Sequence, residues 1–578
     1  MNSAKRILRL IRRIFENLFL FFDEHFLLIL FGIPVGICGG LASVALNRSI
    51  HLASSLLPVS HSHGLFIFFP AIGALLSIFC LSAVFRESAG HAVPLVIHSV
   101  TRKGGLLQLR SSLSHLIGCL CTISFGGSAG PEAPVVVSGS SIGSNIARLF
   151  HFKERQRIVM VGCGIAAAIS AIFNAPIAGI VFAVEVILGE WASVNLVPIA
   201  IASVVATQTS RILQGNQIPF DHRVFIIDTM DIIACLGLAV LVSVAAVLLS
   251  KTLFYVEHAS KRLFRNIYMR GAAGGLCVGC IGWFAPDVLG EGYETIRAII
   301  EDLYAPPLLF MTLLIFCKIA ATSLTLGTGS AGGVFAPALV IGCFVGLAYS
   351  EMINALWPAN AWTSGGCFAL LGMAGMISGV LHAPLTGIFL IVEITGGYEV
   401  ILPLILVSVL ASTITRAYMP ASVYYRELME RGQLLRPRTD ARILADIAIL
   451  DILKEDLEPL PPEMTLREFV NRIKNSPQSH FPVIDPETEK FHGLVLVDMV
   501  QSYLLSPELY DAIVVEEIME SSDIRISPND NLLRVMDHFE QGRTEVLPVI
   551  DRDRFIGTVS KADVLAQYRK ELIVQMAH

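Results

Sequence analysis

Three segments of the chain have residue types and spacings that suit the binding of an anion inside a membrane. Each segment is rich in glycine and alanine, reaches a proline and continues into an apolar stretch. They are Ser88–Ile97 (SAGHAVPLVI), Gly126–Val137 (GGSAGPEAPVVV) and Gly329–Gly342 (GSAGGVFAPALVIG). Proline is favoured at the first position of a helix, so Pro94, Pro134 and Pro337 are each predicted to open one. Ordinary tight turns between helices are the alternative interpretation.

Helix starts of this kind bind anions without a charged side chain. The first N–H groups of a helix have no partner within it, and this end carries roughly half a positive charge. Several such ends aimed at one point make an anion site. Because no buried lysine or arginine holds the ion, the ion can also leave, as transport requires.

Glu132 is a carboxylate at the predicted depth of the membrane, two residues before Pro134. A charge at that depth is costly, and such residues are functional candidates by default. Beside helix N-termini the carboxylate would be stabilised in the place that a substrate anion uses, and on protonation it would swing away. Glu132 is therefore predicted to be a gate and a potential proton carrier. A plain helix cap is the alternative, although Ser, Thr, Asp and Asn are better caps.

The composition predicts a membrane protein around these residues. The chain is 54% hydrophobic and 16% charged, whereas soluble domains are about 25% charged. Ile232–Ser250 carries no charge and is long enough to cross a hydrocarbon core of ~30 Å. Other apolar runs are short and broken by glycine and proline, as in the discontinuous helices of transporters. The net charge of −6, without a basic domain, argues against a nucleic-acid partner.

An internal repeat divides the membrane part into two halves, at about residues 30–215 and 225–420. Asn174–Val186 (NAPIAGIVFAVEV) and His382–Ile394 (HAPLTGIFLIVEI) share Ala-Pro, Gly-Ile and Val-Glu at identical offsets. Repeats in transporters often have inverted topology and place the substrate site at their interface near the membrane midplane. Glu185 and Glu393 occupy the same repeat position, which favours a structural role such as capping a nearby loop.

The chain is predicted to have four parts. Residues 1–25 are rich in lysine and arginine and predict an amphipathic helix on the cytoplasmic membrane surface; a solvated basic segment is the alternative. Residues 26–425 form the membrane domain and residues 426–445 a charged linker. Residues 446–578 form a soluble tail with its own repeat, since PVID recurs at residues 482–485 and 548–551. The two α/β units of the tail are predicted at about 446–508 and 512–573.

The motifs of the membrane part resemble those of the CLC family of chloride channels and chloride/proton exchangers, in its prokaryotic type with a C-terminal pair of CBS domains. Residues 130–134 (GPEAP) resemble G-x-E-G-P, and residues 333–337 (GVFAP) match G-x-F-x-P. Residues 90–94 (GHAVP) resemble G-S-G-I-P, with His91 in place of the serine. Residues 422–424 (SVY), at the end of the last membrane helix, fit the segment with the inner-gate tyrosine, although Tyr425 is adjacent.

The resemblance implies a role for each of these residues. Glu132 would be the external gate, the backbone amides of Val334 and Phe335 would hold the central anion, and Tyr424 would donate its hydroxyl to it. His91 would stand at the inner contact, where a neutral imidazole N–H can still donate. The resemblance also implies an all-α membrane domain of two repeats, a homodimer with one pore per subunit, and a multi-pass protein of the cell (inner) membrane whose N-terminus and tail are cytoplasmic.

Val186 bears on whether the protein is a channel or an exchanger. Exchangers of the family often carry two adjacent glutamates here, and the second accepts the proton on the inner side. In this chain Glu185 matches the first and Val186 the second. Valine cannot carry a proton, so the sequence favours a chloride channel that is gated, of the voltage-gated type. A chloride/proton antiporter, with water or His91 on the proton route, is the alternative.

The tail resembles a pair of CBS domains, which are modules that sense adenine nucleotides. Residues 557–563 (GTVSKAD) fit the pattern G-h-h-[ST]-x-x-D, in which Asp563 would take the ribose hydroxyls and Ser560 would lie near phosphate. The first unit lacks the hydroxyl and is one residue short. The sequence therefore predicts at most one adenine-nucleotide site, and a purely structural tail is the alternative.

Other classes of function find less support in the sequence. No nucleophile elbow, P-loop or set of paired metal ligands indicates an enzyme or a metal site, and no cofactor is required. A CBS-regulated cation transporter would need clustered acidic residues in its spans to coordinate the ion, and membrane carboxylates are sparse here. A membrane-anchored nucleotide sensor would leave the polar segments of the membrane part unexplained. The predicted partners are thus chloride and the lipid bilayer. Protons are a further partner if the protein is an antiporter.

Overall fold

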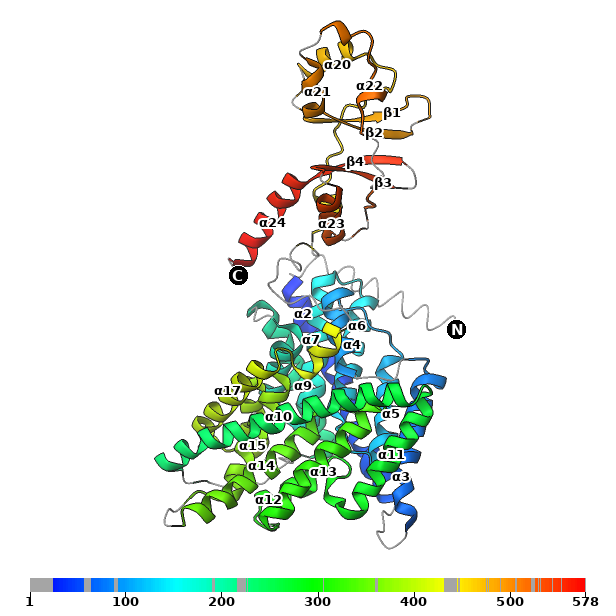
Figure 1. Cartoon of the computed structure of the whole chain (residues 1–578). Helices are drawn as coiled ribbons and strands as arrows, with labels where there is room; N and C mark the ends of the chain where they lie inside the picture. Colours follow the sequence, from blue (N-terminus) through cyan, green and yellow to red (C-terminus); the bar gives the residue numbers. More distant parts are fainter. Residues whose placement is uncertain are drawn as a thin grey trace. The chain divides into compact units, whose positions relative to one another are not determined.

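The structure is a computed structural model of the chain (Figure 1). It describes residues 24–56, 64–87, 92–189, 193–215, 225, 227–304, 306–358, 362–430, 444, 447–474, 476, 478–488, 490–504, 507–520, 525–528, 530, 532–542, 544–551 and 554–576. The chain divides between residues 434 and 435 into two compact units, called here the membrane unit and the tail. The predicted amphipathic segment 1–25 lies almost wholly outside the described residues.

The membrane unit is built from helices. They are α2 (Glu24–Leu56), α3 (Phe69–Phe79), α4 (Ala92–Arg102), α5 (Ser111–Ser124), α6 (Glu132–Leu149), α7 (Glu154–Phe173), α8 (Pro176–Phe182), α9 (Ser193–Gln214), α10 (Thr229–Leu263), α11 (Ile267–Phe284), α12 (Tyr293–Ile300), α13 (Leu308–Gly327), α14 (Phe335–Leu356), α15 (Gly365–Leu381), α16 (Pro384–Thr395), α17 (Ile401–Tyr418) and α18 (Val423–Glu430), with short turns at Gly64–Phe68, Cys80–Val84, Ala183–Leu188 and Pro286–Val288. The prediction of an all-helical membrane domain is confirmed.

Helix length separates two kinds of element in this unit. Among the described residues, nine helices are long and apolar enough to cross a membrane. Four apolar segments are shorter, namely Ser111–Ser124, Pro176–Leu188, Gly365–Leu381 and Pro384–Thr395. Gly365–Leu381, with 17 residues, is at the lower limit of about 17 for spanning a hydrocarbon core, and the other three are too short to span it. Such segments end inside the protein, where their polar ends need partners from other elements.

Glycines at matching repeat positions bring neighbouring helices together in both halves. A Cβ added at Gly139 of α6 would lie 2.1 Å from the Gly164 carbonyl oxygen of α7. A Cβ at Gly342 of α14 would lie 2.4 Å from the Gly372 carbonyl oxygen of α15. Close backbone approach of this kind is how membrane helices gain van der Waals contact without a hydrophobic driving force. The two halves thus pack neighbouring helices through the same kind of close glycine contact.

Glu185 and Glu393 cap each other's half of the repeat. The Glu185 carboxylate, in the turn after α8, accepts hydrogen bonds from the Leu385 N–H at 3.1 Å and the Thr386 N–H at 2.7 Å. The Glu393 carboxylate of α16 accepts from the Ile177 N–H at 2.9 Å and the Ala178 N–H at 2.7 Å. Each carboxylate therefore satisfies the free N–H groups and the positive dipole at the start of the other short helix. The predicted structural role is confirmed by this reciprocal capping.

The tail repeats one α/β unit. The first unit contains α20 (Leu466–Ile473), β1 (His480–Ile484), β2 (Phe491–Leu496), α21 (Val497–Leu504) and α22 (Val515–Ile518), and the second contains α23 (Leu532–Gly542), β3 (Val546–Asp551), β4 (Arg554–Ser560) and α24 (Lys561–Met576), with one-turn helices at Ile449–Asp451 and Pro507–Leu509. Each strand pair is antiparallel, and its register shifts after Val483 in one unit and after Val549 in the other. The shared shift is the structural counterpart of the repeated PVID sequence.

The two units of the tail pack against each other through apolar and polar contacts. The rings of Phe491 and Phe555 stack with centroids 5.1 Å apart. His480 of β1 is buried, and its Nε2 lies 2.8 Å from Thr558 Oγ1 of β4 in a hydrogen bond. The pKa of His480 is lowered from its usual value, chiefly because burial disfavours the charged ring and also because Lys454 repels it, although Asp563 favours the charge.

The tail is expected to lose stability in mild acid through His480. A histidine whose pKa is lower in the folded state binds fewer protons there than in the unfolded chain. The stability that it contributes is therefore complete above about pH 6.5 and is lost as the pH falls toward the lower folded pKa. Equilibrium unfolding of the tail unit (residues 435–578) between about pH 5 and pH 8 measures this slope.

The His480→Gln variant is the control for this measurement. Its amide can still bond Thr558 but does not titrate. We expect the slope below about pH 6.5 to flatten in the variant. An equal slope in both proteins would show that another group causes the acid sensitivity.

Candidate functional site

Two glycine-rich loops from the two halves of the repeat meet and bond to each other inside the membrane unit. The Gly130 N–H donates to the Gly333 carbonyl and the Gly333 N–H donates to the Gly130 carbonyl, both at 2.8 Å. Ser128 bonds Thr322 through their hydroxyls at 3.0 Å, and the Ala331 N–H donates to Ser77 Oγ at 3.0 Å. The bonds of Gly130, Gly333 and Ala331 satisfy irregular backbone away from water. We call this meeting point the loop junction.

The helices that leave these segments begin close to where the sequence predicts them. α6 begins at Glu132, α14 at Phe335 and α4 at Ala92. The sequence predicts that each helix begins at its proline, namely Pro134, Pro337 or Pro94. In the structure each proline is the third residue of its helix. The third residue is still in the first turn, where an N–H has no acceptor within the helix and its loss costs nothing. The loop junction thus places the starts of α6 and α14 side by side.

Glu132 is buried at the loop junction, with 1% of its surface exposed. Its Oε1 accepts a hydrogen bond from the Tyr293 hydroxyl at 2.5 Å. Its Oε2 has no hydrogen-bond partner among the described residues. That oxygen lies in the space above Gly130, because a Cβ there would be 2.0 Å from Oε2 and 3.0 Å from the Ala336 nitrogen. The carboxylate therefore faces the first turn of α14, where free N–H groups stabilise a negative charge.

Aromatic rings surround this carboxylate. Phe335 is 1% exposed, and its ring packs against Phe173 and Phe182 with centroids 5.4 Å and 6.1 Å away. Tyr293 lies against Phe173 at 6.4 Å. Val334 precedes α14 and is also buried. The predicted residues Glu132, Val334 and Phe335 are thus brought together in an apolar enclosure, in which electrostatic interactions are stronger than in water.

Packing separates the two adjacent tyrosines of α18. The Tyr425 hydroxyl donates to the Val186 carbonyl at 3.1 Å. Tyr424 is 4% exposed and lies within electrostatic range of Glu132. Tyr424, the predicted residue, is therefore buried within electrostatic range of Glu132, whereas Tyr425 bonds the backbone at Val186. The sequence predicts Tyr424 at the end of the last membrane helix. In the structure Tyr424 lies at the start of the separate short helix α18. His91 lies outside the described residues.

Three residues near Glu132 were missed in the sequence. Tyr293 opens α12 and bonds Glu132 directly. Lys318 of α13 is fully buried, and its Nζ donates to the carbonyls of Val288 at 2.9 Å and Gly290 at 3.1 Å. Glu291 lies within electrostatic range of both Glu132 and Lys318. The signal for Lys318 was present, because it is the one charged residue of Leu308–Gly327. No comparable pattern marks Tyr293.

The predicted nucleotide residues of the tail lie at the start of α24. The Ser560 hydroxyl donates to the Asp563 carboxylate and accepts the Asp563 N–H at 3.1 Å. Lys454 Nζ lies 3.1 Å from Asp563 Oδ2. Ser560 thus acts as the N-cap of α24 in this structure. Asp563 remains about a quarter exposed, at 27% of its side chain.

Family models match both parts of the chain. The sequence model described as voltage gated chloride channel matches residues 73–416, and the CBS domain model matches residues 515–570. A putative chloride channel protein ClcB-like from Ralstonia nicotianae is 31% identical over 367 residues, which are 62% of this chain and 84% of the relative. The voltage-gated ClC-type chloride channel ClcB of Escherichia coli is 29% identical over 364 residues, 61% of this chain and 85% of the relative.

Solved structures share the fold at low sequence identity. A slow cyanobacterial Cl⁻/H⁺ antiporter superimposes with a TM-score of 0.63 at 22% identity, over 71% of this chain and 99% of that one. A eukaryotic CLC transporter superimposes with a TM-score of 0.61 at 19% identity, over 94% of this chain and 99% of that one. The predicted resemblance is confirmed by these matches. Because the family match covers more than half of the chain, this protein belongs to the CLC family of voltage gated chloride channels, and it carries a C-terminal CBS domain region.

Proposed function

We propose that this protein carries chloride across the membrane along a path that passes the loop junction, with Glu132 as its gate. The observation that carries the proposal is the buried Glu132 carboxylate, which faces the first turn of α14 and has one oxygen without a hydrogen-bond partner among the described residues. An anionic side chain in such a place is held by helix N–H groups and not by a cation. A chloride ion is attracted by the same groups.

Glu132 acts as a gate because its carboxylate and chloride compete for the same position. While Glu132 is charged, its carboxylate occupies the region where the N–H groups of Val334 and Phe335 would hold chloride. Protonation removes the charge and with it most of this attraction, so the side chain leaves and the anion enters. Tyr293 donates to Glu132 Oε1, and a charge-assisted bond of this kind favours the charged, closed form. Chloride flux should therefore rise as the external pH falls.

We propose a channel as the mode of transport. Val186 cannot accept a proton, and its carbonyl is bonded to Tyr425. The relatives from Ralstonia nicotianae and Escherichia coli are both described as chloride channels. An antiporter is the second candidate, since a solved structure of similar fold is a Cl⁻/H⁺ antiporter. It would need a proton route on the inner side that avoids Val186.

The two modes differ in proton movement. Purified protein in liposomes is placed under a chloride gradient, and chloride and proton fluxes are recorded together. We expect chloride to move without driving protons uphill, because no carboxylate stands at residue 186. Uphill proton movement would establish the antiporter instead and would direct attention to water and His91. Absence of chloride flux in protein that is folded would contradict the proposed function itself.

Replacement of the gate is expected to remove its pH dependence. Glu132→Gln keeps the size of the side chain but cannot be charged, so chloride flux should become independent of external pH and stay near the acid-activated rate. Chloride efflux from liposomes across a pH series measures this. Unchanged pH dependence in the variant would rule out Glu132 as the gate.

Two further variants sharpen this result. Tyr293→Phe removes the bond to Oε1 but leaves the carboxylate, so the pH dependence should persist and move to higher pH, because the charged form loses a donor. Glu185→Gln is the matched control, since its carboxylate caps α16 and does not reach the loop junction. It should lower stability and leave the pH dependence unchanged.

We also propose that the tail regulates transport by binding one adenine nucleotide at Ser560 and Asp563. The partial exposure of Asp563, with Lys454 beside it, supports this, because the pair offers a ribose acceptor and a phosphate partner. Calorimetric titration of ATP into the full chain tests it, with Asp563→Ala expected to abolish the binding heat. Equal binding in wild type and variant would rule out Asp563 as part of the nucleotide site, and no binding in wild type would leave the tail as a structural element.

A further inference from the structure

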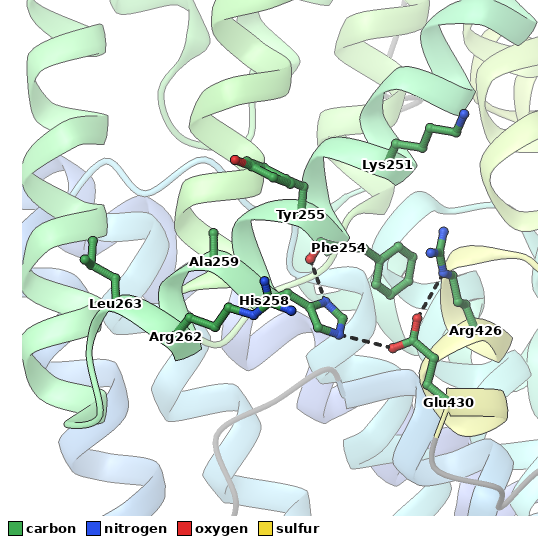
Figure 2. Close-up of a pocket in the computed structure, with 9 residues that line it drawn as sticks. All are labelled: Lys251, Phe254, Tyr255, His258, Ala259, Arg262, Leu263, Arg426 and Glu430. Atoms are coloured by element: carbon green, nitrogen blue, oxygen red, sulfur yellow. Dashed lines mark hydrogen bonds and ion pairs between the residues drawn. The ribbon is translucent and has the colours of Figure 1, made fainter.

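A cavity of about 800 Å³ opens on the membrane unit between the end of α10 and α18 (Figure 2). Three cations take part in its lining, which are Lys251 and Arg262 of α10 and Arg426 of α18. Among the described residues, Glu430 is the one carboxylate that lines it. Three cations and one carboxylate give a formal charge of +2, without counting His258. A cavity with this balance favours an anion.

The charged residues of the cavity differ in whether they have an ion-pair partner. Arg426 Nε lies 3.2 Å from Glu430 Oε1, and the Arg426 guanidinium stacks 4.4 Å from the Phe254 ring centre. His258 Nε2 lies 3.7 Å from the other Glu430 oxygen. Figure 2 shows these contacts between His258, Arg426 and Glu430, with the Lys251 side chain pointing away from them. Among the described residues, neither Lys251 nor Arg262 has an ion-pair partner.

The depth of the cavity follows from the sequence of α10. Ile232–Ser250 carries no charge and is the length of a membrane span. Lys251 is the first charged residue after it, so it lies where the helix leaves the hydrocarbon. Tyr255, one turn further, is 73% exposed, and exposed tyrosines are enriched at the headgroup level of membranes. The cavity is therefore at the boundary between acyl chains and water.

An apolar surface leads along α10 to this cavity. Val240 and Val244 are 50% and 61% exposed. They precede Lys251 by eleven and seven residues, which puts all three on one face of the helix. The same face continues to Tyr255 and Arg262. One ligand could therefore lie with an apolar part against the valines and an anionic part against the cations.

We propose that this cavity binds the headgroup of an anionic phospholipid, with the headgroup lying along α10 from Lys251 toward Arg262 and an acyl chain along Val240 and Val244. The positive charge, the boundary depth and the continuous apolar face together fit a molecule that is anionic at one end and apolar at the other. A free phosphate would use only the cations. A zwitterionic lipid would gain little from a site of net positive charge.

The test measures lipid that stays bound to the full-length protein. The protein is placed in nanodiscs of phosphatidylcholine with or without phosphatidylglycerol, extracted, and examined by native mass spectrometry. We expect one phosphatidylglycerol to be retained per chain and phosphatidylcholine to be lost. Each basic residue near an anionic lipid contributes roughly fivefold in affinity, so Lys251→Gln with Arg262→Gln should weaken retention by roughly 25-fold.

Controls separate this site from general attraction to charge. Arg155→Gln removes an exposed arginine of α7 that does not line the cavity, and it should retain phosphatidylglycerol like wild type. If the double variant does not fold, the two single variants carry the test, with roughly fivefold loss each. Equal retention of phosphatidylcholine, displacement of the lipid by millimolar inorganic phosphate, or equal loss in Arg155→Gln would each overturn the proposal.

Discussion

The membrane unit depends on two pieces of irregular backbone satisfying each other. Backbone groups away from water need hydrogen-bond partners, and a bilayer supplies none. At the loop junction Gly130 and Gly333 bond each other, and hydroxyls from α3 and α13 bond their neighbours. This exchange allows α6 and α14 to begin inside the protein. The free first turns of those helices, which attract negative charge, are a direct consequence of where the loops end.

The same arrangement explains why a carboxylate and not a cation stands at the centre. The helix starts already supply partial positive charge, so Glu132 is stabilised without a lysine or arginine bonded to it among the described residues. Lys318, a fully buried lysine in the described part of the chain, donates to the carbonyls of Val288 and Gly290. Those bonds use two of its three donors. Lys318 thus fixes the chain that leads to Tyr293, and it leaves the helix starts to the anion.

Sequence reasoning reached the fold and the parts of the site that are local in the chain. The glycine-to-proline segments and Glu132 were readable because each depends on residues a few positions apart, and the repeat was readable because its two copies keep the same residues at the same offsets. Tyr293 was not, because it meets Glu132 from 161 residues away and nothing in its own neighbourhood marks it. The choice between Tyr424 and Tyr425 also required packing, since only the bond from Tyr425 to Val186 shows which ring is turned away. The helix starts were misplaced by two residues because proline is tolerated throughout a first turn.

The reciprocal capping by Glu185 and Glu393 has a consequence for how the chain is made. The start of α8 is synthesised some 200 residues before the carboxylate that caps it, because Glu393 belongs to the second half. Until that half has entered the bilayer, the N–H groups of Ile177 and Ala178 lack their native acceptor, and Glu185 has nothing to cap. Neither half can reach its final hydrogen bonding before the other has been synthesised. The two halves must therefore close on each other after the helix that carries Glu393 has entered the bilayer.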